Sequence, residues 1–197
     1  MKIRIKIWAR AFSLTLLFSL FQPLLALPLL SSIADPFAIS QQAQYMQRLE
    51  AGYLSNFPAY VKWPDDVMDL HPDTLYIGLI GADPLGRAGR AYLEGRFFGH
   101  LDFVVDWIGG EPAIDMLLRY QILYIGEMNQ QQVHQLLNLL RGHPVLTVSR
   151  LKGFLGEGGC IQFLVVDDAI TFDVSVPNAE DNHLAIDPRL IIYGQTM

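Results

Sequence analysis

The stretch VLTVSRLKGFLGEGGCIQFLVVDDAITFDV, residues 145–174, decides the fold of this chain. It opens with a short apolar run, passes through a glycine-rich connector, and ends in two apolar runs separated by Asp167 and Asp168. Two β-branched runs joined by a two-residue acidic turn predict an antiparallel hairpin, although Asn-Gly or Asp-Gly is the more usual turn. A buried strand at 145–148 followed by this hairpin requires a mixed sheet.

Short apolar runs upstream predict further strands. The runs at 75–80 and 122–125 contain no alternating polar residues, as in strands that are covered on both faces. In residues 101–107, Asp102 and Asp106 alternate with apolar residues up to Trp107. That alternation predicts an edge strand with one polar face.

Apolar residues spaced three and four apart predict the helices. One stripe runs from residue 39 to Tyr60, with Glu50 among the polar residues opposite it and a bend at Pro58. We expect this helix to end at Trp63, because the following proline disfavours helical geometry in the residue before it.

The remaining helices have start signals. Asp83 followed by Pro84 predicts a capped helix, and Asn129 with Gln132 matches a capping box. A last helix is expected over residues 184–192. Helices that alternate with buried strands predict an α/β fold: a three-layer α/β/α arrangement with a mainly parallel sheet and a C-terminal antiparallel hairpin.

The N-terminus has the order of features of a secretory signal peptide. Four basic residues precede a charge-free apolar run over residues 11–30, and small residues follow. We expect cleavage after Ala34, or alternatively after Ala26, which leaves residues 35–197 as one domain in the periplasm. The alternative is an uncleaved inner-membrane anchor, since the run approaches the ~20 residues that span a bilayer.

Composition narrows the range of partners. Lys and Arg total 14 and Asp and Glu total 20, a formal net charge of −6, and removal of the signal peptide would lower it to −10. An acidic surface argues against nucleic acid and against anionic lipid as binding partners. The single cysteine, Cys160, is expected to be a buried inert thiol or to form an intermolecular bridge.

Motifs for catalysis or metal binding are missing from the sequence. It contains no G-x-S-x-G pattern, no phosphate-binding glycine pattern, and no close spacing among its histidines, which are His71, His100, His134, His143 and His183. We therefore expect no catalytic residues, no metal and no cofactor. A hydrolase remains a third and weaker hypothesis.

Two groups of residues are candidate binding sites. Loops after two predicted strands bring Asp83 and Gly86 toward Ser149 and Arg150, which would suit a periplasmic small-molecule receptor with a pocket at the strand ends. The other group holds the aromatic residues at the end of the first helix, which could be core or a partner surface. Its members are Tyr53, Phe57, Tyr60 and Trp63.

Three segments taken together resemble the YfiR family of small periplasmic proteins. They are NFPAYVKWP at 56–64, LYIGLIGADPLG at 75–86 and LAIDPRLI at 184–191, combined with the stretch at 145–174. The resemblance extends from Tyr45 to the C-terminus. The sequence departs from the family in having Pro58, and in having one cysteine where well-known members carry disulfides.

The resemblance implies a function without catalysis. A member of this family would inhibit an inner-membrane diguanylate cyclase by docking on its sensor region, which lowers cyclic di-GMP synthesis and biofilm formation. An outer-membrane lipoprotein could sequester it, and it could form a homodimer. Other members could serve other membrane sensors, including histidine kinases, so the resemblance leaves the particular partner open.

Overall fold

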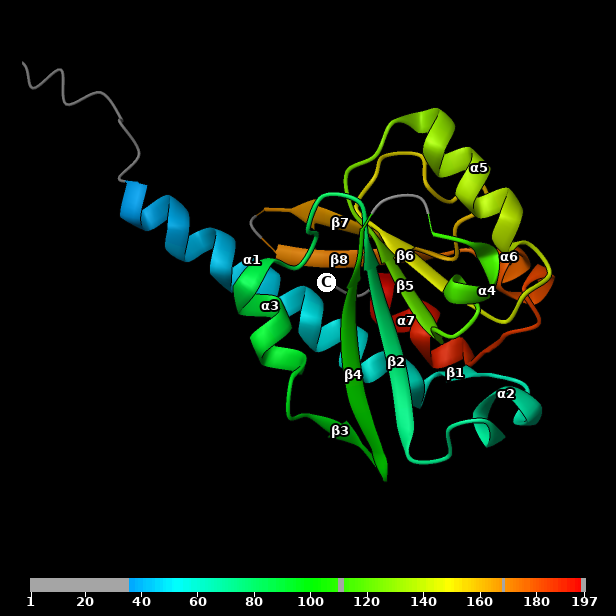
Figure 1. Ribbon diagram of the computed structural model, residues 1–197. Helices are drawn as coiled ribbons and strands as arrows, with labels where there is room; N and C mark the ends of the chain where they lie inside the picture. The colour runs from blue at the N-terminus through cyan, green and yellow to red at the C-terminus, as the bar shows by residue number, and fades with distance from the viewer. Residues whose placement is uncertain (1–35, 110–111, 168, 196–197) are drawn as a thin grey trace, which may run out of the picture. The chain divides into compact units, whose positions relative to one another are not determined.

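A seven-stranded sheet with helices against both faces forms the centre of the structure (Figure 1). The computed structural model describes residues 36–109, 112–167 and 169–195. The expected signal peptide, residues 1–34, lies outside the described residues, and so does the turn residue Asp168. None of the helices in the described ranges combines the length and the apolar character that crossing a membrane requires.

The sheet is mostly parallel, with the spatial order β3-β4-β2-β5-β6-β7-β8. Strands β4, β2, β5, β6 and β7 run in the same direction, whereas β3 and β8 are antiparallel to their neighbours. The strands are β2 (Thr74–Ile80), β3 (Phe97–Phe98), β4 (Leu101–Ile108), β5 (Ile122–Ile125), β6 (Leu146–Ser149), β7 (Ile161–Val166) and β8 (Ala169–Val174). The predicted mixed α/β fold and its C-terminal hairpin are confirmed.

Helices and one smaller sheet complete the fold. The helices are α1 (Pro36–Asn56), α2 (Asp65–Asp69), α3 (Gly86–Leu93), α4 (Ile114–Leu117), α5 (Gln130–Leu140), α6 (Val176–Asp181) and α7 (Pro188–Gln195). A 3-10 turn, Phe57–Ala59, follows α1, and β1 (Val61–Lys62) pairs antiparallel with β9 (Ala185–Ile186). This small sheet joins the segment after the first helix to the segment before the last.

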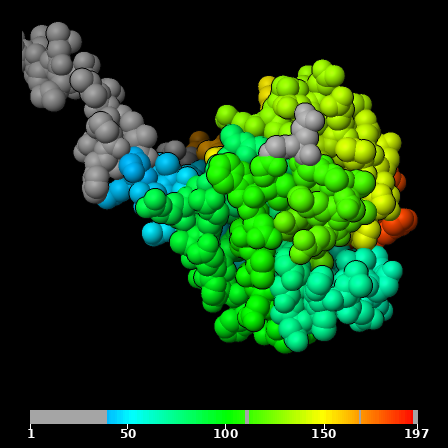
Figure 2. Space-filling model, in the orientation of Figure 1, coloured from blue at the N-terminus to red at the C-terminus, as the bar shows by residue number. Residues whose placement is uncertain are grey.

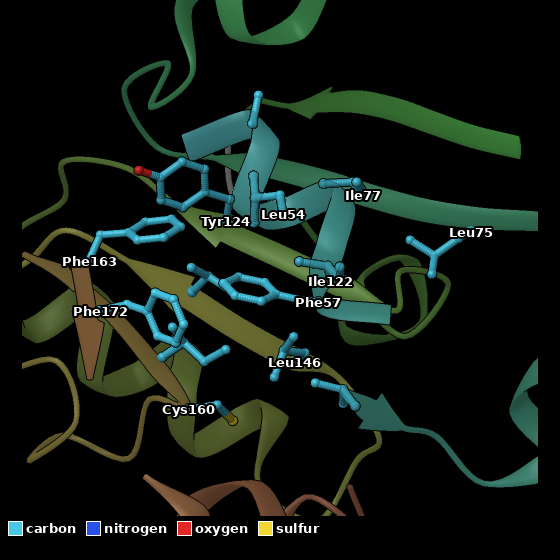
Figure 3. Close-up of a cluster of buried hydrophobic side chains, with 14 of the residues drawn as sticks. Leu54, Phe57, Leu75, Ile77, Ile122, Tyr124, Leu146, Cys160, Phe163 and Phe172 are labelled. Carbon is cyan, nitrogen blue, oxygen red and sulfur yellow. The ribbon is translucent and has the colours of Figure 1, made fainter. Parts of the chain in front are cut away.

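Two apolar cores lie on opposite faces of the central sheet. Alternate residues of β5 illustrate the division, because Ile122 and Tyr124 join the core under α1 and α3, while Leu123 and Ile125 join the core under α4 and α5. Figure 3 shows the first core, in which rings from the 3-10 turn, from β5 and from the β7–β8 hairpin gather. The labelled side chains there are Leu54, Phe57, Leu75, Ile77, Ile122, Tyr124, Leu146, Cys160, Phe163 and Phe172.

Helices α1 and α3 pack closely together on the first face. A side chain at Gly89 would place its Cβ 2.7 Å from the carbonyl oxygen of Gln47, so the two backbones approach at a distance that only glycine permits. In Figure 2 the blue part of α1 projects beyond the green segment that includes α3, and α1 contacts α3 further along, around Gln47.

The first helix differs from its predicted form in two respects. It ends at Asn56, and Pro58 stands in the 3-10 turn, because a proline there removes a helical hydrogen-bond donor. The buried stripe is also rotated from the predicted one, so that Glu50 is fully buried and Tyr53 is half-buried. The prediction that Glu50 lies on the polar side was therefore wrong.

Three other boundaries and the alternation within one strand need correction. Residues before Trp63 form β1 instead of continuing the first helix, and the last helix begins at Pro188, because residues 185–186 pair with β1. Helix α3 begins at Gly86 instead of Pro84. In β4 the alternation shifts after Asp106, which exposes 59% of Trp107 and buries the next residue instead. Helix α6 has no counterpart among the predicted elements.

Cys160 lies at the start of the hairpin, in the first core. Its thiol is fully buried and free, and burial raises its pKa. Of the two expectations for this residue, the buried thiol agrees with the structure. A thiolate is the reactive form, so a buried thiol with a raised pKa is a poor nucleophile.

Gly126 is the glycine on which the junction after β2 and β5 most depends. Its amide donates to the carbonyl oxygen of Ile80 over 2.7 Å, and an added Cβ would collide with the carbonyl oxygen of Ala82. We predict that Gly126→Ala lowers the free energy of unfolding by about 1–3 kcal/mol, because the two loops would have to separate. Urea denaturation followed by circular dichroism measures this loss.

A matched control is Gly109→Ala. Among the residues that the structure describes, and apart from the chain neighbours of Gly109, no atom lies within 4 Å of a Cβ built there. The effect of Gly109→Ala on the free energy of unfolding should therefore stay within about 0.5 kcal/mol. Equal stability of the two variants would mean that the loops at Gly126 do not approach as described.

Candidate functional site

A cavity of about 480 Å³ opens at the carboxyl ends of β2, β5 and β6. Its lining comes from the segments 82–84, 124–127 and 149–151, each at the end of one of these strands. The chain leaves β2 for α3, on one face of the sheet, and leaves β5 for α5, on the other face. Adjacent strands whose connections run to opposite faces leave a crevice between them, and this is where open α/β sheets bind ligands.

The loop after β2 is held by its own side chain. Asp83 accepts a hydrogen bond from the amide of Gly86 over 3.0 Å, and its second oxygen lies 3.4 Å from the guanidinium of Arg90. Asp83 thus accepts from the first residue of α3, but the predicted capping position is corrected, because Leu85 and not Asp83 is the N-cap of this helix. Gly86 supports Asp83 but does not line the cavity.

The loop after β6 is shaped by Ser149. The buried hydroxyl donates to the carbonyl oxygen of Ile125 over 2.7 Å and accepts from the amide of Leu151 over 3.1 Å. Both hydrogen-bonding roles of the hydroxyl are used within the protein, so it is occupied as a structural group. It places Arg150, the next residue, at the cavity.

A buried carboxyl group lies behind Arg150. Glu50 of α1 accepts a 2.8 Å hydrogen bond from the hydroxyl of Tyr124 through Oε2, and its Oε1 lies 3.1 Å from Nε of Arg150. The Nε contact has the distance of an ion pair, but Oε1 accepts no hydrogen bond from any residue that the structure describes. Tyr124 and Arg150 both line the cavity, so the carboxyl group sits directly behind its wall.

Burial sets the protonation of this group. It raises the pKa of Glu50 from 4.5 to about 7, although the charge of Arg150 and the hydrogen bond from Tyr124 act in the opposite direction. The pKa of Tyr124 is raised well above 10 by burial and by the nearby carboxylate, so this phenol stays protonated. Glu50 therefore changes charge near neutral pH.

Three of the four candidate pocket residues line one cavity, and the sequence analysis did not point to the group behind it. Asp83, Ser149 and Arg150 line the cavity, as the strand-end argument requires. Glu50 was assigned to the solvent side of α1. A sequence signal did exist, because Glu50 lies four residues from both Met46 and Leu54, a spacing that places the three on one face of a helix. In the structure all three are buried.

A second concave surface lies between the end of α1 and α7. We call it the aromatic groove; its volume is about 310 Å³ and its lining residues are Tyr53, Asn56, Phe57, Tyr60, Phe172, Leu190 and Tyr193. Phe57 and Phe172 are buried at its base, with ring centroids 5.6 Å apart. The rings of Tyr60 and Tyr193 meet edge to face at 5.5 Å.

Three of the four predicted aromatic residues meet in this groove. Tyr53 lines it and donates a 3.0 Å hydrogen bond to the carbonyl oxygen of Ile170 on the edge strand β8. Trp63 lies elsewhere: its ring is buried, and its indole nitrogen donates to the carbonyl oxygen of Gln121 over 3.2 Å. Tyr193, which the sequence pattern did not single out, is 54% exposed.

The titratable groups that line the cavity are Asp83, Tyr124, Glu127 and Arg150, with Glu50 behind them. Within the described ranges, no group of three His, Cys, Asp or Glu residues is placed to hold a metal ion. The carboxyl group with the most strongly shifted pKa, Glu50, is fully buried and has Tyr124 and Arg150 as neighbours. Neither neighbour resembles the activated nucleophile with an adjacent base that covalent catalysis requires.

The fold defines a class of three-layer α/β domain with a mostly parallel sheet and a C-terminal hairpin. The YfiR/HmsC-like family matches residues 47–193, so the chain belongs to that family. The family resemblance of the sequence is thus confirmed, and membership is consistent with a regulator of a diguanylate cyclase. A search of curated proteins found no significant match.

The raised pKa of Glu50 predicts a specific pH dependence of stability. The folded protein holds this proton more tightly than the unfolded chain, so the free energy of unfolding should fall as pH rises from about 4.5 to about 7. The contribution is on the order of 3 kcal/mol and should be largely absent in Glu50→Gln, which keeps the size of the side chain without its titration. Urea denaturation at pH 5 and pH 8 measures both slopes.

Glu94→Gln serves as the control. Glu94 is exposed, so this substitution removes one carboxylate without affecting the buried network. The free energy of unfolding of Glu94→Gln should change with pH as it does in the unaltered protein. If the free energy of unfolding of Glu50→Gln also had the same slope against pH as the unaltered protein, Glu50 would not titrate in the buried state described.

Proposed function

We propose that this chain is a non-catalytic regulatory protein of the periplasm. In this proposal it binds the external region of an inner-membrane diguanylate cyclase and inhibits the enzyme, which lowers cyclic di-GMP and biofilm formation. Membership of the YfiR/HmsC-like family supports the class of partner. The observation that carries the proposal is the aromatic groove, a concave surface suited to a protein partner.

The groove has the composition of a protein-binding surface. Aromatic residues are enriched in interfaces because each presents a large rigid area and, in tyrosine, a polar group at its end. Tyr60 and Tyr193 supply such rings next to the buried base formed by Phe57. An apolar side chain from the partner could pack against these rings.

Charged residues at the rim add polarity. Arg189 pairs with Asp187 over 2.7 Å, and its guanidinium carbon lies 5.6 Å from the ring centroid of Tyr60. An exposed ion pair contributes little stability of its own. A polar rim around an aromatic base is the usual anatomy of an interface, and it allows a partner to be oriented as well as held.

The same surface fits the other interactions that we propose. An outer-membrane lipoprotein that covered the groove would withdraw the protein from the cyclase, and a second copy of the chain could occupy it in a homodimer. A different membrane sensor, such as a histidine kinase, would use the same docking surface. Crosslinking in the cell distinguishes these partners, because it identifies which of them the protein captures.

We predict that Tyr193→Ala and Tyr60→Ala reduce capture of the inner-membrane partner by about tenfold or more, the loss expected when a central aromatic contact is removed. Cellular cyclic di-GMP should rise at the same time. The measurement is crosslinking of the tagged full-length protein in its own cell, mass spectrometry of what is captured, and quantification of cyclic di-GMP.

Phe97→Ala is the matched control. Phe97 is 71% exposed on β3 and does not line the groove, so its removal tests for a general effect of losing a surface ring. Folded groove variants that still capture the partner and still lower cyclic di-GMP would contradict the docking surface. Capture of a histidine kinase with unchanged cyclic di-GMP would replace the cyclase as partner.

A further inference from the structure

The cavity at the strand ends holds an arginine whose charge is only partly used by the protein. Arg150 lines the cavity, and 46% of its side chain is exposed. Its closest ionic contact is through Nε, on the side that faces Glu50. A guanidinium group can hold a carboxylate through two parallel hydrogen bonds from one edge.

The partner of Arg150 inside the protein is poorly satisfied. Oε1 of Glu50 is fully buried, and no residue that the structure describes donates a hydrogen bond to it. A buried carboxylate in this state is costly, and its ionised form depends on the charge of Arg150. The same arginine can therefore be shared between the buried carboxyl group and an anion in the cavity.

The rest of the lining selects against strongly charged ligands. Ala82, Pro84 and Leu151 supply apolar surface, and Tyr124 is among the lining residues. The remaining charged lining residues are acidic: the exposed Glu127, and Asp83, whose charge is paired with Arg90 of α3. Within the described lining, Arg150 is the cation and its charged neighbours are acidic, which suits a ligand with a single negative charge better than a phosphate dianion.

We propose that this cavity binds a small monocarboxylic acid with an apolar or aromatic body, whose carboxylate pairs with Arg150. A volume of about 480 Å³ lies within the range of small-molecule sites. The site is separate from the aromatic groove, and the proposal does not depend on the identity of the protein partner.

Binding is coupled to a proton on Glu50. The groups that face Glu50 are the Tyr124 hydroxyl, which stays protonated, and Arg150, while Asp83, Arg90 and Glu127 lie around the cavity beyond them. A bound carboxylate draws on the charge of Arg150, which leaves Glu50 more stable as the neutral acid. Affinity for the anion therefore falls as pH rises through 7.

The test uses the full chain purified from cells that express it, with isovalerate and phenylacetate as probes. Each acid is compared with its neutral amide, which has nearly the same shape. Both acids stay ionised at pH 6 and above, since carboxyl groups titrate near pH 4. For probes with about seven to ten non-hydrogen atoms, a Kd of about 1 mM or tighter is expected.

Titrations followed by amide NMR at pH 6 should show that each carboxylate binds about tenfold or more tightly than its amide. The shifted resonances should belong to the lining segments 124–127 and 149–151. If neither acid binds more tightly than its amide, or if the shifts fall elsewhere, the proposal is wrong.

Arg150→Gln should weaken binding of both acids by about tenfold or more. Because this change leaves Glu50 buried without its cation, the double variant Glu50→Gln with Arg150→Gln provides a folded alternative with the same expected loss. Lys152→Gln is the control, since it removes a neighbouring positive charge from a residue that does not line this cavity. Unchanged binding in the folded double variant would overturn the role of Arg150.

Glu50→Gln alone tests the coupling to the proton. The unaltered protein should bind phenylacetate up to about tenfold more weakly at pH 8 than at pH 6, whereas Glu50→Gln should bind it equally at both. Equal affinity of the unaltered protein at the two pH values would contradict the sharing of Arg150 between Glu50 and the ligand.

Discussion

The packing of α1 against the first face of the sheet is the constraint on which the rest of the structure depends. The helix buries Leu54, and the 3-10 turn that follows it buries Phe57, among residues of the central and C-terminal strands. The helix also carries Glu50 to the end of β5, and Tyr53 to β8. Because both candidate surfaces use residues of this helix, the core and the two sites depend on the same contact.

The edge of the sheet at β8 is covered by α1 and by α7. Tyr53 donates to the carbonyl oxygen of Ile170, and the hydroxyl of Thr171 donates to the carbonyl oxygen of Gly194 in α7. An uncovered edge strand presents free backbone groups to other chains and is prone to pair with them. The same covering elements, α1 and α7, form the two sides of the aromatic groove.

The two surfaces have different chemistry, which fits different kinds of ligand. The groove is aromatic and open, with an exposed ion pair at its rim, as in interfaces between proteins. The cavity at the strand ends contains an arginine, a buried carboxyl group and apolar walls, as in sites for small molecules. They lie at different places along α1, with Glu50 at one and Tyr53 at the other.

The sequence by itself determined the fold class and most of the elements. Continuous apolar runs and the hairpin pattern were enough, because strands that are buried on both faces leave a strong local signal. The capping box at Asn129 was also readable, and the structure contains both of its hydrogen bonds. The position of Asp83 beside Ser149 and Arg150 at one cavity was also predictable, because parallel strands end at the same edge of the sheet.

Tertiary structure decided the features that depend on residues far apart in the chain. The short pairing of β1 with β9 replaced the expected ends of the first and last helices, because two-residue strands have no periodicity to read. Burial of Glu50 required Tyr124 and Arg150 as partners, which lie 74 and 100 positions away. The aromatic groove likewise required Tyr193 from the last helix, and a sequence pattern within one helix carries no information about a ring that a distant helix supplies.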